Sequence, residues 1–174
     1  MYRTKFLVLK HTVYALFLFL VYLLQITPRA LTISGINPLM ATAFAVVVAC
    51  VEGEFIGGIY GGVAGILCDL SAHTYFGYNA IVLLILCTAC GLLMVLLVKQ
   101  NWLSVTLTGL AVLIIQTLLE FYFYYGLWGY ESLGVLFTRH TLPTIAYSTI
   151  FIPMFYFLAN WFKHRMDQLM VVPE

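Results

Sequence analysis

Residues 53–69 read GEFIGGIYGGVAGILCD. Glycine recurs there at every fourth position, and the next step of four ends on Asp69; the glycines are Gly53, Gly57, Gly61 and Gly65. Positions four apart lie on one face of an α-helix. Because glycine has no side chain, such a face lets a second helix backbone come close inside a membrane. The stretch predicts a membrane helix with a glycine face, packed either within its own bundle or against the span of a partner.

The composition of the whole chain agrees with a membrane location. Of its 174 residues 63% are hydrophobic and 9% are charged, and the mean hydropathy is +1.02. Soluble domains have about 45–50% apolar and about 25% charged residues. Eight Lys and Arg against seven Asp and Glu leave a net charge of +1, so no basic surface for nucleic acid is expected. These values exclude a soluble enzyme, a disordered chain and a nucleic-acid binder, and they predict an all-α integral membrane protein.

Apolar runs divide the chain into six predicted spans. A span needs about 20 mostly apolar residues, so six spans leave no room for a soluble domain, and residues 1–174 are expected to form a single transmembrane domain. The first run has the basic flank of a signal peptide but no small-residue cleavage site, so we expect an uncleaved span. The predicted spans are residues 12–27, 38–51, 54–70, 78–98, 102–125 and 142–162.

The distribution of basic residues predicts the orientation. With six spans, one side holds six basic residues and the other holds only Arg29 and Arg139. Basic residues concentrate on the cytoplasmic side, so both termini are expected there. If the short run 38–51 did not cross, the same residues would divide four against four. The six are Arg3, Lys5, Lys10, Lys99, Lys163 and Arg165.

Aromatic side chains are expected to mark the outer membrane interface. Amphipathic aromatic rings prefer the boundary between membrane and water, and a cluster of them follows the fifth span. Its members are Tyr122, Tyr124, Tyr125, Trp128 and Tyr130.

Three charged residues are expected at similar depth near the outer end. Asp69 ends the third span, Glu120 lies late in the fifth, and Arg139 precedes the sixth. They predict either an ion pair or an interfacial network that orders the outer ends, or a polar pocket for a ligand or a partner. By contrast, Glu52 and Glu54 are expected to be exposed in the turn between the second and third spans.

No residue pattern indicates catalysis or a cofactor. Cys87 and Cys90 form a C-x-x-C pair inside an apolar run, and we interpret them as buried reduced thiols because a zinc site needs further ligands. The zinc-protease, hydrolase and phosphate-loop motifs are also missing from the sequence. We therefore expect a non-enzymatic protein with no cofactor and no metal.

The central stretch also resembles a known family. Residues 57–71, GGIYGGVAGILCDLS, followed by GYNA at 77–80, are similar to the central motif of the rod shape-determining protein MreD family. The LLQITP that closes the first span at 23–28 and the RHTLP of residues 139–143 are further similarities. Glu120 falls where such proteins carry a carboxylate.

This resemblance implies a multi-pass protein of the bacterial cytoplasmic (inner) membrane. The family implies a scaffold of the cell-elongation complex that binds MreC and, through it, connects MreB filaments to the peptidoglycan polymerase and transpeptidase. It also implies a fold similar to the substrate-binding subunits of energy-coupling-factor transporters. The alternative function is such a vitamin-binding subunit, with the polar residues of the outer side as its pocket.

Overall fold

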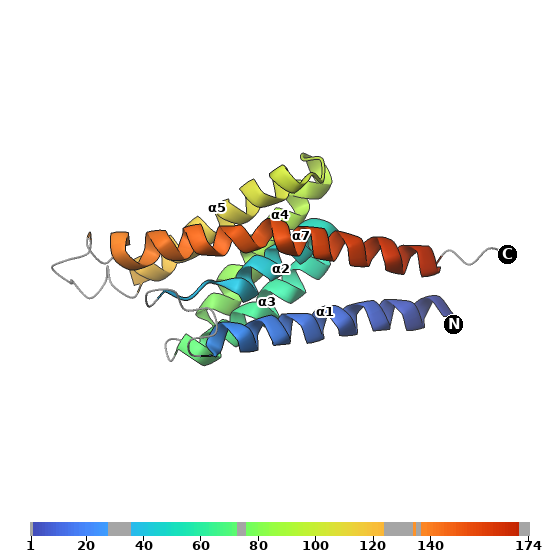
Figure 1. Cartoon of the computed structure of the whole chain (residues 1–174), viewed down its shortest axis with the longest axis horizontal. Helices are drawn as coiled ribbons and strands as arrows, with labels where there is room; N and C mark the ends of the chain where they lie inside the picture. Colours follow the sequence, from blue (N-terminus) through green and yellow to red (C-terminus); the bar gives the residue numbers. More distant parts are fainter. Residues whose placement is uncertain (1, 28–35, 73–75, 124–133, 135–136, 171–174) are drawn as a thin grey trace.

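The computed structural model describes residues 2–27, 36–72, 76–123, 134 and 137–170 (Figure 1). Within these ranges the chain is built from helices, which confirms the predicted all-α class. In chain order the helices are α1 (Tyr2–Ile26), α2 (Met40–Glu52), α3 (Glu54–Ala72), α4 (Tyr78–Leu96), α5 (Trp102–Phe121), the short π-helical segment η2 (Phe137–Thr141) and α7 (Leu142–Met170).

Helix α2 forms the centre of the molecule. Every residue from Met40 to Val51 is buried, and α1, α3, α4, α5 and α7 all contact the helix. Its 13 residues extend about 20 Å at 1.5 Å per residue, which is less than the ~30 Å of a hydrocarbon core. Because protein surrounds α2, neighbouring side chains can bind the backbone groups at its ends.

Both ends of the described chain lie at the same end of the molecule. In Figure 1 the helices run back and forth between two ends, and α1 and α7 extend past the others where the N and C labels lie. The number of membrane crossings itself stays a prediction from the charge distribution.

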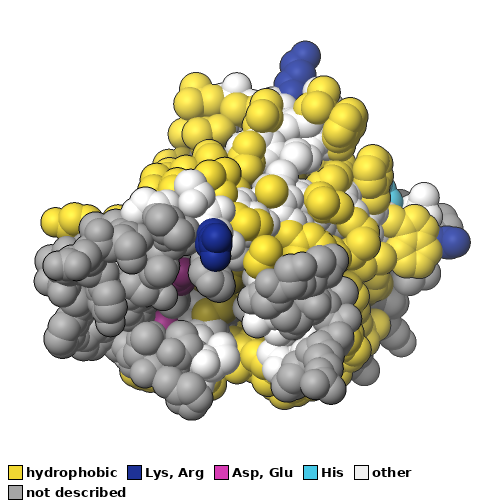
Figure 2. Space-filling model, turned by 60° about the vertical axis from the view of Figure 1, so that its left-hand side comes forward, with side chains coloured by type: hydrophobic (Ala, Val, Ile, Leu, Met, Phe, Trp, Pro, Cys, Tyr) yellow, Lys and Arg dark blue, Asp and Glu magenta, His cyan; other side chains and the backbone are white. Residues whose placement is uncertain are grey.

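Four helical stretches of the described residues are long and apolar enough to cross a membrane: Val8–Ile26, Tyr78–Leu96, Trp102–Phe121 and Phe137–Met166. Hydrophobic side chains also cover much of the molecular surface seen in Figure 2. These findings support a membrane protein. Helix α2 is apolar but shorter, and α3 is not among the four, so six crossings stay a prediction.

The helix boundaries differ from the predicted spans mainly at the two termini. Helix α1 begins at Tyr2 and α7 continues to Met170, whereas the apolar runs predicted 12–27 and 142–162. Charged residues end an apolar run, but they do not end a helix, because its backbone hydrogen bonds are internal. Arg29 lies outside the described residues, and so do four members of the predicted aromatic cluster, Tyr124, Tyr125, Trp128 and Tyr130.

Candidate functional site

Three of the four predicted glycines form a close seam between α3 and its neighbours. A Cβ atom added to Gly57 would lie 2.5 Å from the Cβ of Ala49 in α2. One added to Gly61 would lie 2.6 Å from the carbonyl oxygen of Leu83 in α4, and one on Gly65 would overlap the backbone of Ala80. The glycine face is thus occupied inside the chain, which fits the first of the two predicted uses. A partner's span would have to dock elsewhere.

Gly53 has a different role from the other three. It lies between α2 and α3 rather than on the face of α3, and its φ of +99° is one that glycine adopts without strain. Its N–H donates to the carbonyl oxygen of Ala49 and closes the last turn of α2. Gly91 of α4, which the sequence analysis did not select, packs on this turn: an added Cβ would lie 2.6 Å from the Cα of Glu54.

Asp69 binds the first turn of the next helix. Its carboxylate accepts hydrogen bonds from the backbone N–H groups of Gly77 at 2.8 Å, Asn79 at 3.1 Å and Ala80 at 3.3 Å. The first N–H groups of a helix have no partner within it, and no side chain of Gly77 can cap α4. The buried charge of Asp69 is therefore stabilised by three donors and by the positive end of the helix dipole.

Two amides connect this cap to Glu120. The side-chain Nε2 of Gln116 donates to Asn79 Oδ1 at 3.4 Å and to Glu120 Oε1 at 3.3 Å. Asn79 and Gln116 are buried in α4 and α5. Asn79 belongs to the quoted motif, but the sequence predicted no role for either side chain. Each is a single amide in an apolar run, so only the three-dimensional contact identifies them.

Arg139 does not join the acidic residues in an ion pair. It lies in η2 with an exposed side chain, and within the described ranges no salt bridge links it to Asp69 or Glu120. The predicted ion pair with Arg139 is therefore wrong, whereas the other form of that prediction, an interfacial network at the outer ends, agrees with the contacts of Asp69 and Glu120. A carboxylate–amide network, in which backbone N–H groups satisfy Asp69, takes its place.

A second polar cluster lies at the other end of the bundle. Lys10 Nζ lies 2.6 Å from Glu52 Oε2, and the two side chains are 6% and 7% exposed. The hydroxyl of Tyr14 donates to Glu52 Oε1 at 3.1 Å. The expectation that Glu52 is exposed was wrong, because α1 covers the turn. A residue 42 positions away supplies its counter-charge.

Side chains from four other positions bind the ends of α2. At its start, Gln25 Oε1 accepts from the N–H of Ala41 at 2.9 Å and Ser148 Oγ from that of Leu39 at 2.8 Å. At its end, two carbonyl oxygens accept from Gln100 Nε2 at 2.7 Å and Lys163 Nζ at 2.5 Å. A short helix inside a membrane protein needs such partners, so these contacts fix α2 at both ends.

The described residues contain no group of three or more His, Cys, Asp or Glu side chains placed to hold a metal ion. Cys50, Cys68, Cys87 and Cys90 are free and buried.

The comparisons with known proteins found no match. No protein-family model matches the chain, and neither a curated protein nor a solved structure matches it. A function for this chain is therefore inferred from its motif residues and from the geometry in which they meet.

Proposed function

We propose that this chain is a non-enzymatic scaffold of the bacterial cell-elongation complex. In this proposal it lies in the inner membrane with both termini in the cytoplasm. It binds MreC and so helps couple MreB filaments to the peptidoglycan polymerase and transpeptidase. The proposal originates in the resemblance of residues 57–71 and 77–80 to the MreD family.

The observation that carries the proposal is that the residues of this motif meet in one structural unit. Gly61 and Gly65 bring α4 against α3, and this approach lets Asp69 reach the first turn of α4. The motif residues thus depend on one another although they are separated in the sequence, as Gly65 and Ala80 and as Asp69 and Ala80 are. Such a motif is suited to holding two helices rigidly.

Rigidity is what a scaffold contributes to binding. A partner that docks on a surface held in one conformation loses less free energy to ordering that surface. The bound ends of α2, the α3–α4 seam and the Lys10–Glu52 pair each hold helices in a fixed relation. Because the glycine face is covered, the proposal places MreC on the outer surface of the bundle.

The test is affinity purification of the tagged chain from its native membrane in mild detergent, with mass spectrometry of the retained proteins. The proposal predicts recovery of MreC together with the wall-synthesis enzymes. A matched untagged membrane measures background. Retention of neither MreC nor any wall-synthesis enzyme above that background would contradict the proposal.

One observation favours the alternative function, a vitamin-binding transporter subunit. The Oε1 atom of Gln116 is buried and has no hydrogen-bond partner among the described residues. A ligand with a donor group would satisfy such an atom, since an unpaired buried acceptor is costly. The same purification separates the two functions, because a transporter subunit would retain an ATPase and a small molecule.

A further inference from the structure

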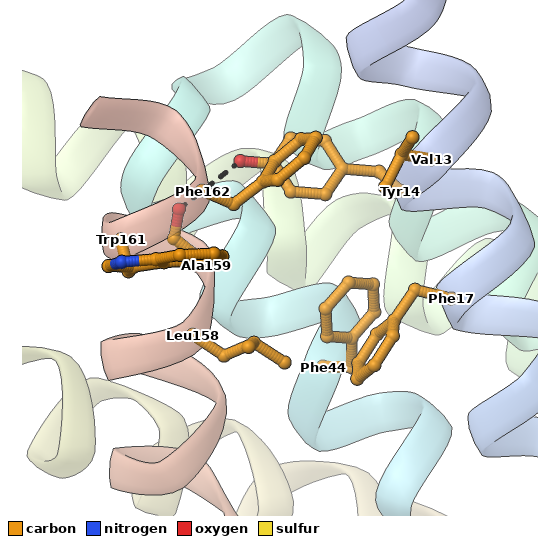
Figure 3. A pocket seen from close by; sticks show the side chains of 8 residues that line it. All are labelled: Val13, Tyr14, Phe17, Phe44, Leu158, Ala159, Trp161 and Phe162. Carbon is orange, nitrogen blue, oxygen red and sulfur yellow. Dashed lines mark hydrogen bonds between the residues drawn. The ribbon is translucent and has the colours of Figure 1, made fainter. Parts of the chain in front are cut away.

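An apolar crevice lies between α1 and α7 (Figure 3). It has a volume of about 120 Å³, and the side chains that line it are apolar on the surface they present. Val13 and Phe17 of α1 form one wall, Leu158 and Trp161 of α7 the other, and Phe44 of α2 the floor. The crevice reaches the outside of the bundle, where Trp161 is 60% exposed.

Aromatic pairs connect the two helices that form the walls. The rings of Tyr14 and Phe162 meet across α1 and α7 with centroids 5.3 Å apart, and those of Phe17 and Phe155 with centroids 6.1 Å apart. The Tyr14 hydroxyl contacts Glu52 and the carbonyl oxygen of Ala159, so its polar group is already engaged. The crevice is therefore part of the packing of the bundle and offers only hydrocarbon contacts.

Its size excludes a helix as the occupant. An α-helix with side chains is about 10–12 Å across, whereas a cavity of ~150 Å³ holds one benzene ring. A volume of about 120 Å³ accommodates a few methylene groups of one chain. Because the surrounding bilayer is itself hydrocarbon, such a slot alone would not distinguish one lipid from another.

A cation beside the crevice can distinguish lipids by the charge of their headgroups. Arg165 follows Trp161 by one turn of α7, and its guanidinium carbon lies 5.8 Å from the Trp161 ring centroid. The neighbouring lysines are engaged: Lys163 donates to Val51, and Lys10 pairs with Glu52. Arg165 is exposed, and no ion pair joins it to another side chain of the described ranges.

We propose that the α1–α7 crevice binds one acyl chain of an anionic phospholipid whose phosphate is held by Arg165. A guanidinium forms paired hydrogen bonds with phosphate oxygens, and tryptophan prefers the depth at which lipid headgroups meet the acyl chains. With the C-terminus in the cytoplasm, Arg165 faces the leaflet that is rich in anionic lipids. This choice of leaflet rests on the proposed topology, whereas the site itself does not depend on binding to MreC.

Trp161 provides the readout for the test. The chain has three tryptophans, so Trp102 and Trp128 are replaced by Phe, and the protein is placed in bilayers with brominated acyl chains, which quench indole fluorescence on contact. Quenching by brominated phosphatidylglycerol is compared with quenching by brominated phosphatidylcholine. Both headgroups carry a phosphate, but the choline cation neutralises that of phosphatidylcholine, so only phosphatidylglycerol offers Arg165 a net negative charge. We therefore expect a preference of roughly fivefold for phosphatidylglycerol at the Trp161 site, the effect of one arginine near a membrane surface.

Two pairs of variants separate the headgroup contact from the crevice. Arg165→Ala should abolish the preference, and Arg165→Lys should retain part of it. Val13→Phe narrows the mouth and should lower quenching by both lipids, while Leu16→Phe, on the exposed side of α1, should not. Size-exclusion chromatography confirms that each variant is folded.

Three results would overturn the proposal. These are equal quenching by the two lipids, a preference that survives in Arg165→Ala, and equal effects of Val13→Phe and Leu16→Phe. The purified chain is tested without any protein partner, so the result does not depend on whether the chain binds MreC.

Discussion

At the scale of single residues, buried charges are satisfied by groups distant in the sequence. Asp69 receives three backbone N–H groups from the start of α4, and Glu52 receives Lys10 and Tyr14 from α1. A charge inside a membrane protein is costly unless it has such partners. The two carboxylates therefore fix the relative positions of helices at opposite ends of the bundle.

Replacing Asp69 by Ala should destabilise the protein by about 2 kcal/mol. The change removes the cap of α4 and leaves buried N–H groups without a partner. The free energy of unfolding is measured by SDS titration in mixed micelles. Arg139→Ala is the control and should change it by less than ~0.5 kcal/mol. The two changes in unfolding free energy should add in the double variant. A coupling energy above ~0.5 kcal/mol would instead indicate an interaction between Asp69 and Arg139, which the structure does not show.

Replacing Glu52 by Ala should cost about 3–5 kcal/mol, because the charge of Lys10 would stay buried without its partner. The neighbouring Glu54, whose side chain is only partly buried, is the matched control, and Glu54→Ala should have a small effect. Changing Lys10 to Met together with Glu52 to Leu should recover much of the loss. Equal unfolding free energies for Glu52→Ala and Glu54→Ala would contradict the buried pair.

At the scale of elements, α3 and α4 form a hairpin joined by small residues and closed by Asp69. Gly61 and Gly65 leave no space for a Cβ atom on the side of α4, whereas a Cβ added to Gly62 would be 3.5 Å from Leu84. The glycines of α3 are therefore not equivalent, although all belong to one glycine-rich helix.

Gly65→Ala should destabilise the protein by about 1–3 kcal/mol, because the added methyl group would overlap the backbone of α4. Gly62→Ala has room and gains helix propensity, so it should be neutral or stabilising by up to ~1 kcal/mol. The same SDS titration compares the two. Similar effects of both changes would mean that α3 and α4 are not in close backbone contact.

The sequence predicted these elements better than the contacts between them. Glycine spacing along one helix indicated the close face of α3, since that pattern depends only on helix geometry. It could not place Gly53 outside the helix or select Gly91, because those roles depend on how the α2–α3 turn meets α4. The contact between Asn79 and Gln116 was not predicted for the same reason, because it forms only where α4 and α5 meet.

At the scale of the whole molecule, polar side chains from several helices and loops bind the backbone groups at the two ends of the central helix α2. Gln25, Ser148, Gln100 and Lys163 come from regions far apart in the sequence and meet at the ends of α2. The all-α class predicted from the apolar runs is confirmed within the described residues, and four of the helical stretches are long and apolar enough to cross a membrane. Whether the short α2 crosses the membrane depends on how the helices around it are placed in the bilayer.

Six crossings predict opposite sides for the two turns that flank α4. Phe76 and Lys99 are both exposed, and the four natural cysteines are buried, so single cysteines can be introduced at either position. A membrane-impermeant maleimide applied to cells with a permeabilised outer membrane should label Phe76→Cys. It should label Lys99→Cys only after lysis. The reverse pattern would contradict the predicted topology.

The most direct test of the scaffold proposal is binding between two purified components. The chain is placed in lipid nanodiscs and titrated with purified full-length MreC, with an unrelated single-span protein as the control. The account predicts saturable binding to MreC, weakened by Gly65→Ala and unchanged by Gly62→Ala. Binding to MreC no stronger than to the unrelated span would contradict it.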